Sequence, residues 1–264
     1  MYMRNTLILS LLFALVGGSC SNNSIKNIQQ IETSKQAVSF GLPQNISENI
    51  TLQKKTDYLK ESTVNYQIVS IDPAKSNFDL HYQLPPQRLD EWQSQLKKQI
   101  LVNAAYFDEN FNPTGRFIYN NDDITTQNYS SNSAGTVIIN NGKLEILNQS
   151  EYKKRAINPG EKVFQSFPFL IINSKAQLTE DSHQIARRTI LAETDSQLLI
   201  IVVDQTAISL YNLMNVLLES DLHIKTALNL DGGQSTGMTI DTNSYQGEIL
   251  SITPLPLVLS VSVL

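Results

Sequence analysis

Residues 227–238 read Ala-Leu-Asn-Leu-Asp-Gly-Gly-Gln-Ser-Thr-Gly-Met, and the rest of the chain is organised around them. The alternation of apolar residues predicts a strand that ends at Asp231, before two glycines begin a turn. Glycine adopts positive φ and lets backbone N–H groups approach a ligand, so this turn can present a carboxylate beside an anion-binding backbone. Asp-Gly pairs also form plain turns. We favour a functional loop, whose candidate substrate-binding residues are Asn229, Gly232, Gly233, Ser235 and Thr236.

The same loop matches the G-x-S-x-G pattern of a serine-hydrolase nucleophile elbow at residues 233–237. Such an elbow needs a helix directly after the serine, whereas residues 238–242 are β-branched and alternate as in a strand. In hydrolases of that fold the histidine base follows the serine, but all three histidines of this chain precede Ser235. We therefore rank a serine hydrolase below an anion-binding loop.

The composition is that of an ordinary globular protein, with 264 residues, 41% of them hydrophobic and 17% charged. The net charge is −5, and the basic residues are scattered along the chain. Because binding to the phosphate backbone depends on clustered Lys and Arg, nucleic acid is not an expected partner.

The N-terminal residues 1–20 have the build of an export signal, with Arg4 before an apolar run and small residues at its end. Cys20 follows the small residues, as does the lipid-modified cysteine of bacterial lipoproteins, although Gly17 stands where those proteins usually have leucine. We expect an exported protein, either a cell-envelope lipoprotein anchored at Cys20 or a secreted one. Residues 21–49 are polar and predict a flexible tether, which leaves 50–264 for a single catalytic domain.

Periodicity predicts several strands and two helices in that domain. Strands are expected at 66–72, 78–82, 100–103, 166–173, 187–192, 197–204, 227–231, 238–242 and 254–261, a hairpin at 135–147, and helices at 88–99 and 209–220. The second helix, capped by Ser209, connects a strand ending in Asp204 to the strand ending in Asp231. Such a βαβ-like unit brings both carboxylates to one edge of a sheet, where ligands of α/β proteins bind.

A second informative stretch spans residues 100–108, where a buried strand delivers Asn103 next to two alanines. The Asn103 amide offers donors and an acceptor to a ligand, and Tyr106 or Phe107 can form an apolar platform for a sugar. Asp108 then leads into a loop. The alternative is that both aromatic rings are core residues and that Asn103 caps a turn.

The pair Arg187 and Arg188 enters an apolar strand. An unpaired arginine is costly to bury, so one of the two is expected to face a carboxylate or an anionic ligand. The alternative is that the arginine lies on an edge strand, where its charge prevents pairing with another chain.

These motifs together resemble the phosphodiester glycosidase family over about residues 63–264. The residues that carry the resemblance are Asn103 to Asp108 with Pro113 and Gly115, Arg188-Thr189, Asp204, the Ser209 helix, and Asn229 to Thr236. Many relatives have glycines in place of Ala104, Ala105, Gln205 and Gln234. The resemblance implies a mixed α/β fold with largely antiparallel sheets and flanking helices. It also implies a hydrolase that cleaves a sugar-1-phosphodiester at the glycosidic bond.

The chemistry of the residues is compatible with that activity. A glycosyl–phosphate bond breaks when the phosphate is held and the positive charge that develops on the sugar is stabilised, which an arginine, loop amides and carboxylates can do. The resemblance thus makes Asp231, Asp204, Asp108 and Arg188 the candidate catalytic residues, and Gly115 joins the substrate-binding set. A divalent cation is compatible with the carboxylates, although no spacing defines a metal site.

The expected partner is a phosphorylated glycan at the cell surface or outside the cell, and the membrane is expected only through a lipid on Cys20. The alternative class is a surface lipoprotein that binds anionic glycans through the same cleft without turning them over.

Overall fold

A computed structural model describes residues 41–59 and 62–264, which belong to one compact unit. The predicted export signal, the lipidation site at Cys20 and most of the tether lie outside these residues. No helix in the described part of the chain is both long and apolar enough to span a membrane.

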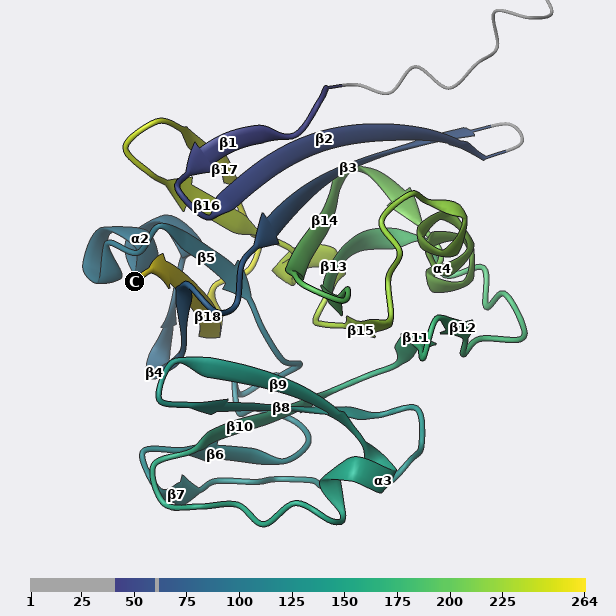
Figure 1. The fold of residues 1–264 in the computed structure, drawn as a ribbon. Coiled ribbons are helices and arrows are strands. Elements are labelled where there is room, and N and C mark those ends of the chain that lie inside the picture. The colour runs from purple at the N-terminus through teal and green to yellow at the C-terminus, as the bar shows by residue number, and fades with distance from the viewer. Residues whose placement is uncertain (1–40, 60–61) are drawn as a thin grey trace, which may run out of the picture. The chain divides into compact units, whose positions relative to one another are not determined.

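The described chain forms three sheets, and the largest has eight strands (Figure 1). Its order is β1-β2-β3-β14-β13-β15-β11-β12. In chain order the bounds are β1 Gln44–Ser47, β2 Ile50–Leu59, β3 Ser62–Ile71, β11 Phe169–Ile172, β12 Lys175–Ala176, β13 Ala186–Glu193, β14 Leu198–Ile208 and β15 Thr226–Asn229.

The two smaller sheets have five strands each, in the orders β7-β6-β10-β8-β9 and β17-β16-β5-β18-β4. The first contains β6 Phe117–Tyr119, β7 Asp122–Asp123, β8 Gly135–Asn140, β9 Lys143–Asn148 and β10 Lys162–Ser166. The second contains β4 Ser76–Gln87, β5 Ile100–Asn103, β16 Met238–Asp241, β17 Gln246–Ile249 and β18 Leu255–Val263.

Three short α-helices and one 3₁₀ turn complete the described chain: α2 Leu89–Leu96, α3 Gln149–Tyr152, α4 Leu210–Glu219 and η1 Gly233–Ser235. The Ser209 side chain caps α4 as predicted, since its oxygen accepts a hydrogen bond from the Asn212 amide. In α2, Leu89 and Trp92 are buried in the same apolar cluster as Leu101 of β5 and Val258 of β18.

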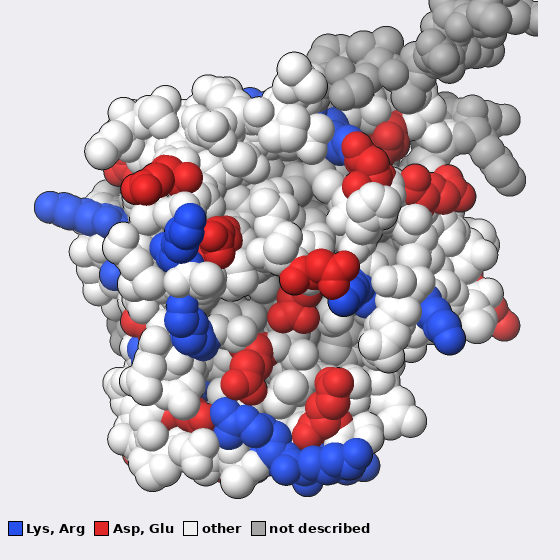
Figure 2. Space-filling view, in the orientation of Figure 1, with Lys and Arg blue, Asp and Glu red and all other residues white. Residues whose placement is uncertain are grey.

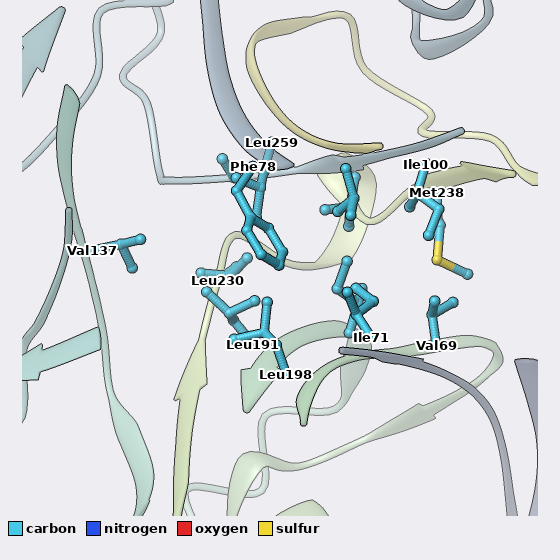
Figure 3. Packing of buried hydrophobic residues seen from close by; sticks show 14 of the residues in the cluster. Val69, Ile71, Phe78, Ile100, Val137, Leu191, Leu198, Leu230, Met238 and Leu259 are labelled. Carbon is cyan, nitrogen blue, oxygen red and sulfur yellow. The ribbon is translucent and has the colours of Figure 1, made fainter. Parts of the chain in front are cut away.

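The interior lies between the three sheets and is apolar. Figure 3 shows Val69 and Leu191 of the eight-stranded sheet together with Val137, Phe78 and Leu259 from the two smaller sheets, all members of one buried cluster. The other face of the eight-stranded sheet is covered by α4 (Figure 1), through a second cluster that includes Leu213, Leu217 and Ile201. At about 25 cal/mol per Å² of apolar area, this burial is the main stabilising contribution.

The order of strands brings the C-terminal ends of β14 and β15 to the same end of the eight-stranded sheet, as the sequence predicts. β14 and β15 both pair antiparallel with β13, which lies between them. They are therefore parallel to each other, with α4 as their connection. The loops after both strands emerge at the same edge of the sheet, near the N-terminal half of β13.

Three details differ from the sequence-based expectations. Strands dominate the fold and helices are few, so the α part is smaller than a mixed α/β fold suggests. β1 lies inside the segment assigned to the tether, and its Ile46 is fully buried, so ordered structure begins before residue 50. The single strand expected at 166–173 is two strands in different sheets, because Pro168 has no N–H to donate to a ladder.

Acidic and basic side chains are mixed over the face of the molecule that Figure 2 shows.

Candidate active site

The loop after β15 is fixed by backbone hydrogen bonds to two sheets. The Leu230 amide donates to the Thr189 carbonyl of β13 at 2.9 Å, and the Asp231 amide donates to the Ala104 carbonyl at 3.0 Å. Ala104 directly follows β5, which belongs to the smaller sheet. Asp231 therefore lies where the eight-stranded sheet meets that sheet.

Asn103 at the end of β5 holds both ends of this loop. Its Nδ2 donates to the Asp231 carbonyl at 2.7 Å, and its Oδ1 accepts from the Thr189 hydroxyl at 2.7 Å and the Gly237 amide at 3.1 Å. Asn103 is 1% exposed. The amide that we expected to contact a ligand thus binds protein groups, and Asn103 positions the loop.

The Asp231 side chain is largely shielded from water. Its Oδ1 accepts a 2.8 Å hydrogen bond from the Gly232 amide. Burial raises the pKa of this carboxyl to about 6, and the Ser235 hydroxyl and the Gly232 amide limit the increase. The Ser235 hydroxyl, which we expected to bind substrate, therefore lies against the carboxylate.

Arg188 approaches the same loop from β13. Its Nε donates to the Ile208 carbonyl at 3.0 Å and its Nη2 to the Gln184 carbonyl at 2.5 Å. Its Nη1 lies 3.8 Å from the point that a β-carbon on Gly232 would occupy. Burial lowers the pKa of Arg188, and the nearby Tyr106 opposes that shift. Two backbone carbonyls thus fix the guanidinium and turn one edge toward the glycine loop.

The two glycines of the loop have different conformations. Gly233 has a φ of +61, which agrees with the positive φ predicted for this turn. An added β-carbon would meet no atom within 4 Å. Gly232 is extended with φ −130, and an added β-carbon would lie 3.0 Å from the Arg187 carbonyl oxygen. Gly232 allows close packing of two backbones, and Gly233 leaves open space above the loop.

Tyr106 joins the site on another side. Its hydroxyl donates to the Phe167 carbonyl at 3.2 Å and accepts from the Asn229 amide at 2.6 Å. Burial raises the pKa of Tyr106, and the negative charge of Asp231 adds to the increase. The structure thus brings together Tyr106, Arg188, Asn229, Asp231 and Gly232.

Asp204 lies apart from this cluster, next to Arg187. Ala186 pairs with Ile208 but Arg188 pairs with Val203, so residues 204–207 bulge out opposite Arg187. Asp204 lines a groove of about 310 Å³ under the β2–β3 hairpin, and its charge acts on the Arg187 guanidinium. The bulge therefore places Asp204 beside Arg187 and this groove, and no hydrogen bond or ion pair joins it to Asp231 among the described residues.

Three further candidates have structural roles. The Asp108 carboxylate accepts from the amides of Asn110 and Asn112, both at 2.9 Å, so it organises its own turn, and these bonds lower its pKa. Phe107 packs against the core and stacks on Phe111. Gly115, with φ +82, gives room to the Tyr129 ring, 2.7 Å from where a β-carbon would lie. No hydrogen bond or ring contact joins any of the three to Asp231 or Arg188 among the described residues.

Thr236 is fully buried, and its Oγ1 has no hydrogen-bond partner among the described residues. Within the described chain, no group of three or more His, Cys, Asp or Glu side chains could hold a metal ion.

Sequence reasoning missed Phe167, which lies between β10 and β11. An aromatic residue before Pro168 in an apolar run was the available signal, because the proline marks a break in the strand. That signal shows only that the chain leaves one sheet at this point. It does not show that the ring reaches Tyr106.

The fold and the site define a strand-dominated protein with a carboxylate and an arginine where antiparallel sheets meet. The sequence of residues 97–255 matches the phosphodiester glycosidase family. The chain belongs to this family. No curated protein sequence matches the chain.

Solved structures share the fold. One is the catalytic domain of zebrafish N-acetylglucosamine-1-phosphodiester alpha-N-acetylglucosaminidase, auto-inhibited by its pro-peptide, with a TM-score of 0.59 and 14% identity over 92% of this chain and 94% of that one. Another is a hypothetical protein from Synechocystis, with a TM-score of 0.57 and 14% identity over 84% of this chain. The alignment spans 63% of the Synechocystis protein.

Proposed function

We propose that this protein hydrolyses a sugar-1-phosphodiester at its glycosidic bond and releases the sugar from a phosphomonoester. The observation that carries the proposal is the meeting of Asp231, Gly232 and Arg188, a shielded carboxylate of raised pKa beside a glycine loop and a fixed guanidinium. Family membership supports a hydrolase of this kind.

The phosphate binds over the glycine loop. Arg188 directs Nη1 toward Gly232, while its Nε and Nη2 remain on backbone carbonyls. The open space at Gly233 lets a phosphate oxygen approach the backbone. Because one edge of Arg188 is already used, the guanidinium contributes charge and a directed donor, and it does not form a two-bond clamp through that edge.

Asp231 acts on the sugar side. The bond between C1 and the bridging oxygen breaks, the electron pair stays on the phosphate oxygen, and positive charge develops on the sugar ring. The ionised Asp231 stabilises that charge or bonds to C1, and water then supplies the hydroxyl at C1 while its proton is released. A phosphomonoester is a fair leaving group, so a strong general acid is not required.

The test is release of N-acetylglucosamine from N-acetylglucosamine-1-phospho-methyl-mannoside by the purified chain, with Asp231→Asn as the inactive control. We expect sugar release that depends on Asp231. Binding of this diester without release would favour the alternative of a glycan-binding surface protein. Neither binding nor release would reject the proposal for this substrate class.

We also propose that the chain is exported and acts on a surface or extracellular glycan. The support is the signal-like sequence of residues 1–20 and the single cysteine that ends it. Mass spectrometry of the native protein should find a lipid-modified N-terminus at Cys20. An intact N-terminus at Met1 would contradict export by this route, and cleavage beyond Cys20 would favour secretion.

A further inference from the structure

The Phe167 side chain is an unusual feature of the site. It is 39% exposed, although its backbone carbonyl is held by two buried groups, the Tyr106 hydroxyl at 3.2 Å and the Asn229 amide at 2.9 Å. Single exposed apolar residues are common on proteins. This one differs because the two groups that fix it are close to Asp231. The Asp231 charge acts on Tyr106, and Asn229 lies two residues before Asp231 in the chain.

Two tyrosine rings hold the Phe167 ring in place. Tyr106 lies with its ring centroid 4.9 Å away at an interplanar angle of 32°, and Tyr129 meets Phe167 edge-on, also at 4.9 Å and at 77°. The Tyr129 ring is itself fixed, since its hydroxyl donates to the Thr114 hydroxyl at 2.7 Å and it packs against Gly115. The result is a rigid aromatic surface with one part open to solvent.

Asn229 supplies a second, independent observation. It is fully buried, and its Nδ2 donates to the Tyr106 hydroxyl and the Phe167 carbonyl, which fixes the orientation of the amide. Its Oδ1 has no hydrogen-bond partner among the described residues. Unpaired buried acceptors are rare, and atoms of this kind gather at functional sites. The Oδ1 atom has less than 1 Å² of accessible surface, so Asn229 fixes Tyr106 and Phe167 from beneath the surface of the site.

We propose that Phe167 forms the sugar-binding subsite of the protein, held in place by Asn229 and the two tyrosine rings. The apolar C–H face of a pyranose packs on the exposed part of the Phe167 ring. This places the sugar on the Tyr106 side of Asp231 and the phosphate on the Arg188 side. The inference rests on the proposed function, because it assigns the sugar to one side of the same carboxylate.

The test replaces the ring and keeps the rest of the site. Phe167→Ala should raise KM for the sugar-1-phosphodiester about tenfold with a smaller change in kcat, and Phe167→Leu should behave similarly because it keeps apolar area but no flat face. Phe167→Tyr keeps the aromatic face, so its KM should equal that of the wild type. The matched control is Ile124→Ala, since Ile124 is 38% exposed and is held at β6, where its amide donates to the Phe117 carbonyl at 3.1 Å.

Two further measurements identify the part of the substrate that contacts Phe167. The KM increase should be the same for a methyl and a methyl-mannoside phosphodiester, and the inhibition constant of inorganic phosphate should not change. An increase seen only with the larger alcohol would assign Phe167 to the other side of the phosphate. An equal loss of phosphate affinity, or an equal effect of Ile124→Ala, would show a structural role. Each of these results would overturn the proposal.

Binding of free N-acetylglucosamine, measured by calorimetry, separates this inference from the proposed function. Wild-type protein should bind the sugar about tenfold more tightly than Phe167→Ala, whether or not it cleaves the diester. Equal binding by both would reject the subsite even if sugar release is observed. Tighter wild-type binding without any release would reject the hydrolase and keep the subsite.

Discussion

The side-chain amide of Asn103 donates a 2.7 Å hydrogen bond to the backbone carbonyl of Asp231, 128 residues further along the chain. The same side chain accepts from Thr189 on the strand that carries Arg188. One buried amide thus sets the position of the proposed catalytic carboxylate relative to the strand of the proposed phosphate-binding arginine.

Asn103→Ala should lower both stability and activity. It leaves the Thr189 hydroxyl and the Gly237 amide without their acceptor in a buried region, so we expect a loss of about 2–4 kcal/mol in unfolding free energy, measured by urea denaturation. Asn243→Ala, at an exposed position, is the control and should stay within about 0.5 kcal/mol of wild type. A similar small loss for Asn103→Ala would show that the loop is held by its backbone bonds alone.

Arg188→Lys should reduce kcat/KM at least about tenfold, equivalent to about 1.4 kcal/mol of transition-state binding. Lysine keeps the charge but cannot hold the carbonyls of Ile208 and Gln184 and still direct a donor at Gly232. Arg88→Lys on the surface is the matched control and should leave kcat/KM unchanged. Full activity in Arg188→Lys would remove the arginine from the phosphate site.

Substitutions at Gly233 separate backbone strain from obstruction of the loop. Gly233→Ala should cost about 1 kcal/mol of unfolding free energy because φ is +61, although no atom crowds the new side chain. Gly233→Asn should recover much of that stability, since asparagine tolerates this conformation. Both variants should lose activity because a side chain fills the space over the loop. A stable and fully active Gly233→Asn would show that phosphate does not approach this residue.

Much of the site could be predicted from local patterns. The 227–238 loop follows from an Asp-Gly-Gly turn, and the common direction of β14 and β15 follows from a strand-helix-strand order; both patterns act over short distances. Asp204 could not be placed, because the offset between Ala186 and Arg188 in the β13–β14 register appears only when the strands pair. The roles of Asn103 and Phe167 depend on partners far apart in the sequence, such as Thr189 and Tyr106.

The raised pKa of Asp231 makes a signed prediction for stability. Burial raises it from 3.8 to about 6, so the folded state binds the proton more tightly, and its contribution to stability is present below about pH 4 and lost as the pH rises through 6. Asp231→Asn should therefore gain stability relative to wild type between pH 4 and 7. Glu193, whose pKa burial raises to about 7, titrates in both proteins and cancels in the difference.

The same titration predicts the pH dependence of activity. A carboxylate that stabilises positive charge or bonds to C1 must be ionised, so kcat/KM should rise as the pH increases through about 6 and then level off. The measurement is kcat/KM from pH 4.5 to 8. A fall in activity through pH 6 would assign Asp231 as a proton donor instead.

The most direct test of the central claim is to identify the bond that breaks, by hydrolysis of the sugar-1-phosphodiester in ¹⁸O-labelled water followed by mass spectrometry. Attack at C1 beside Asp231 predicts that the label enters the released sugar and that the phosphomonoester stays unlabelled. The products should be analysed at once, because the free sugar exchanges its C1 oxygen with water, and unlabelled sugar in labelled water provides the control. Label in the phosphomonoester would mean that the phosphorus–oxygen bond is cleaved, and it would contradict the assignment of a glycosidase.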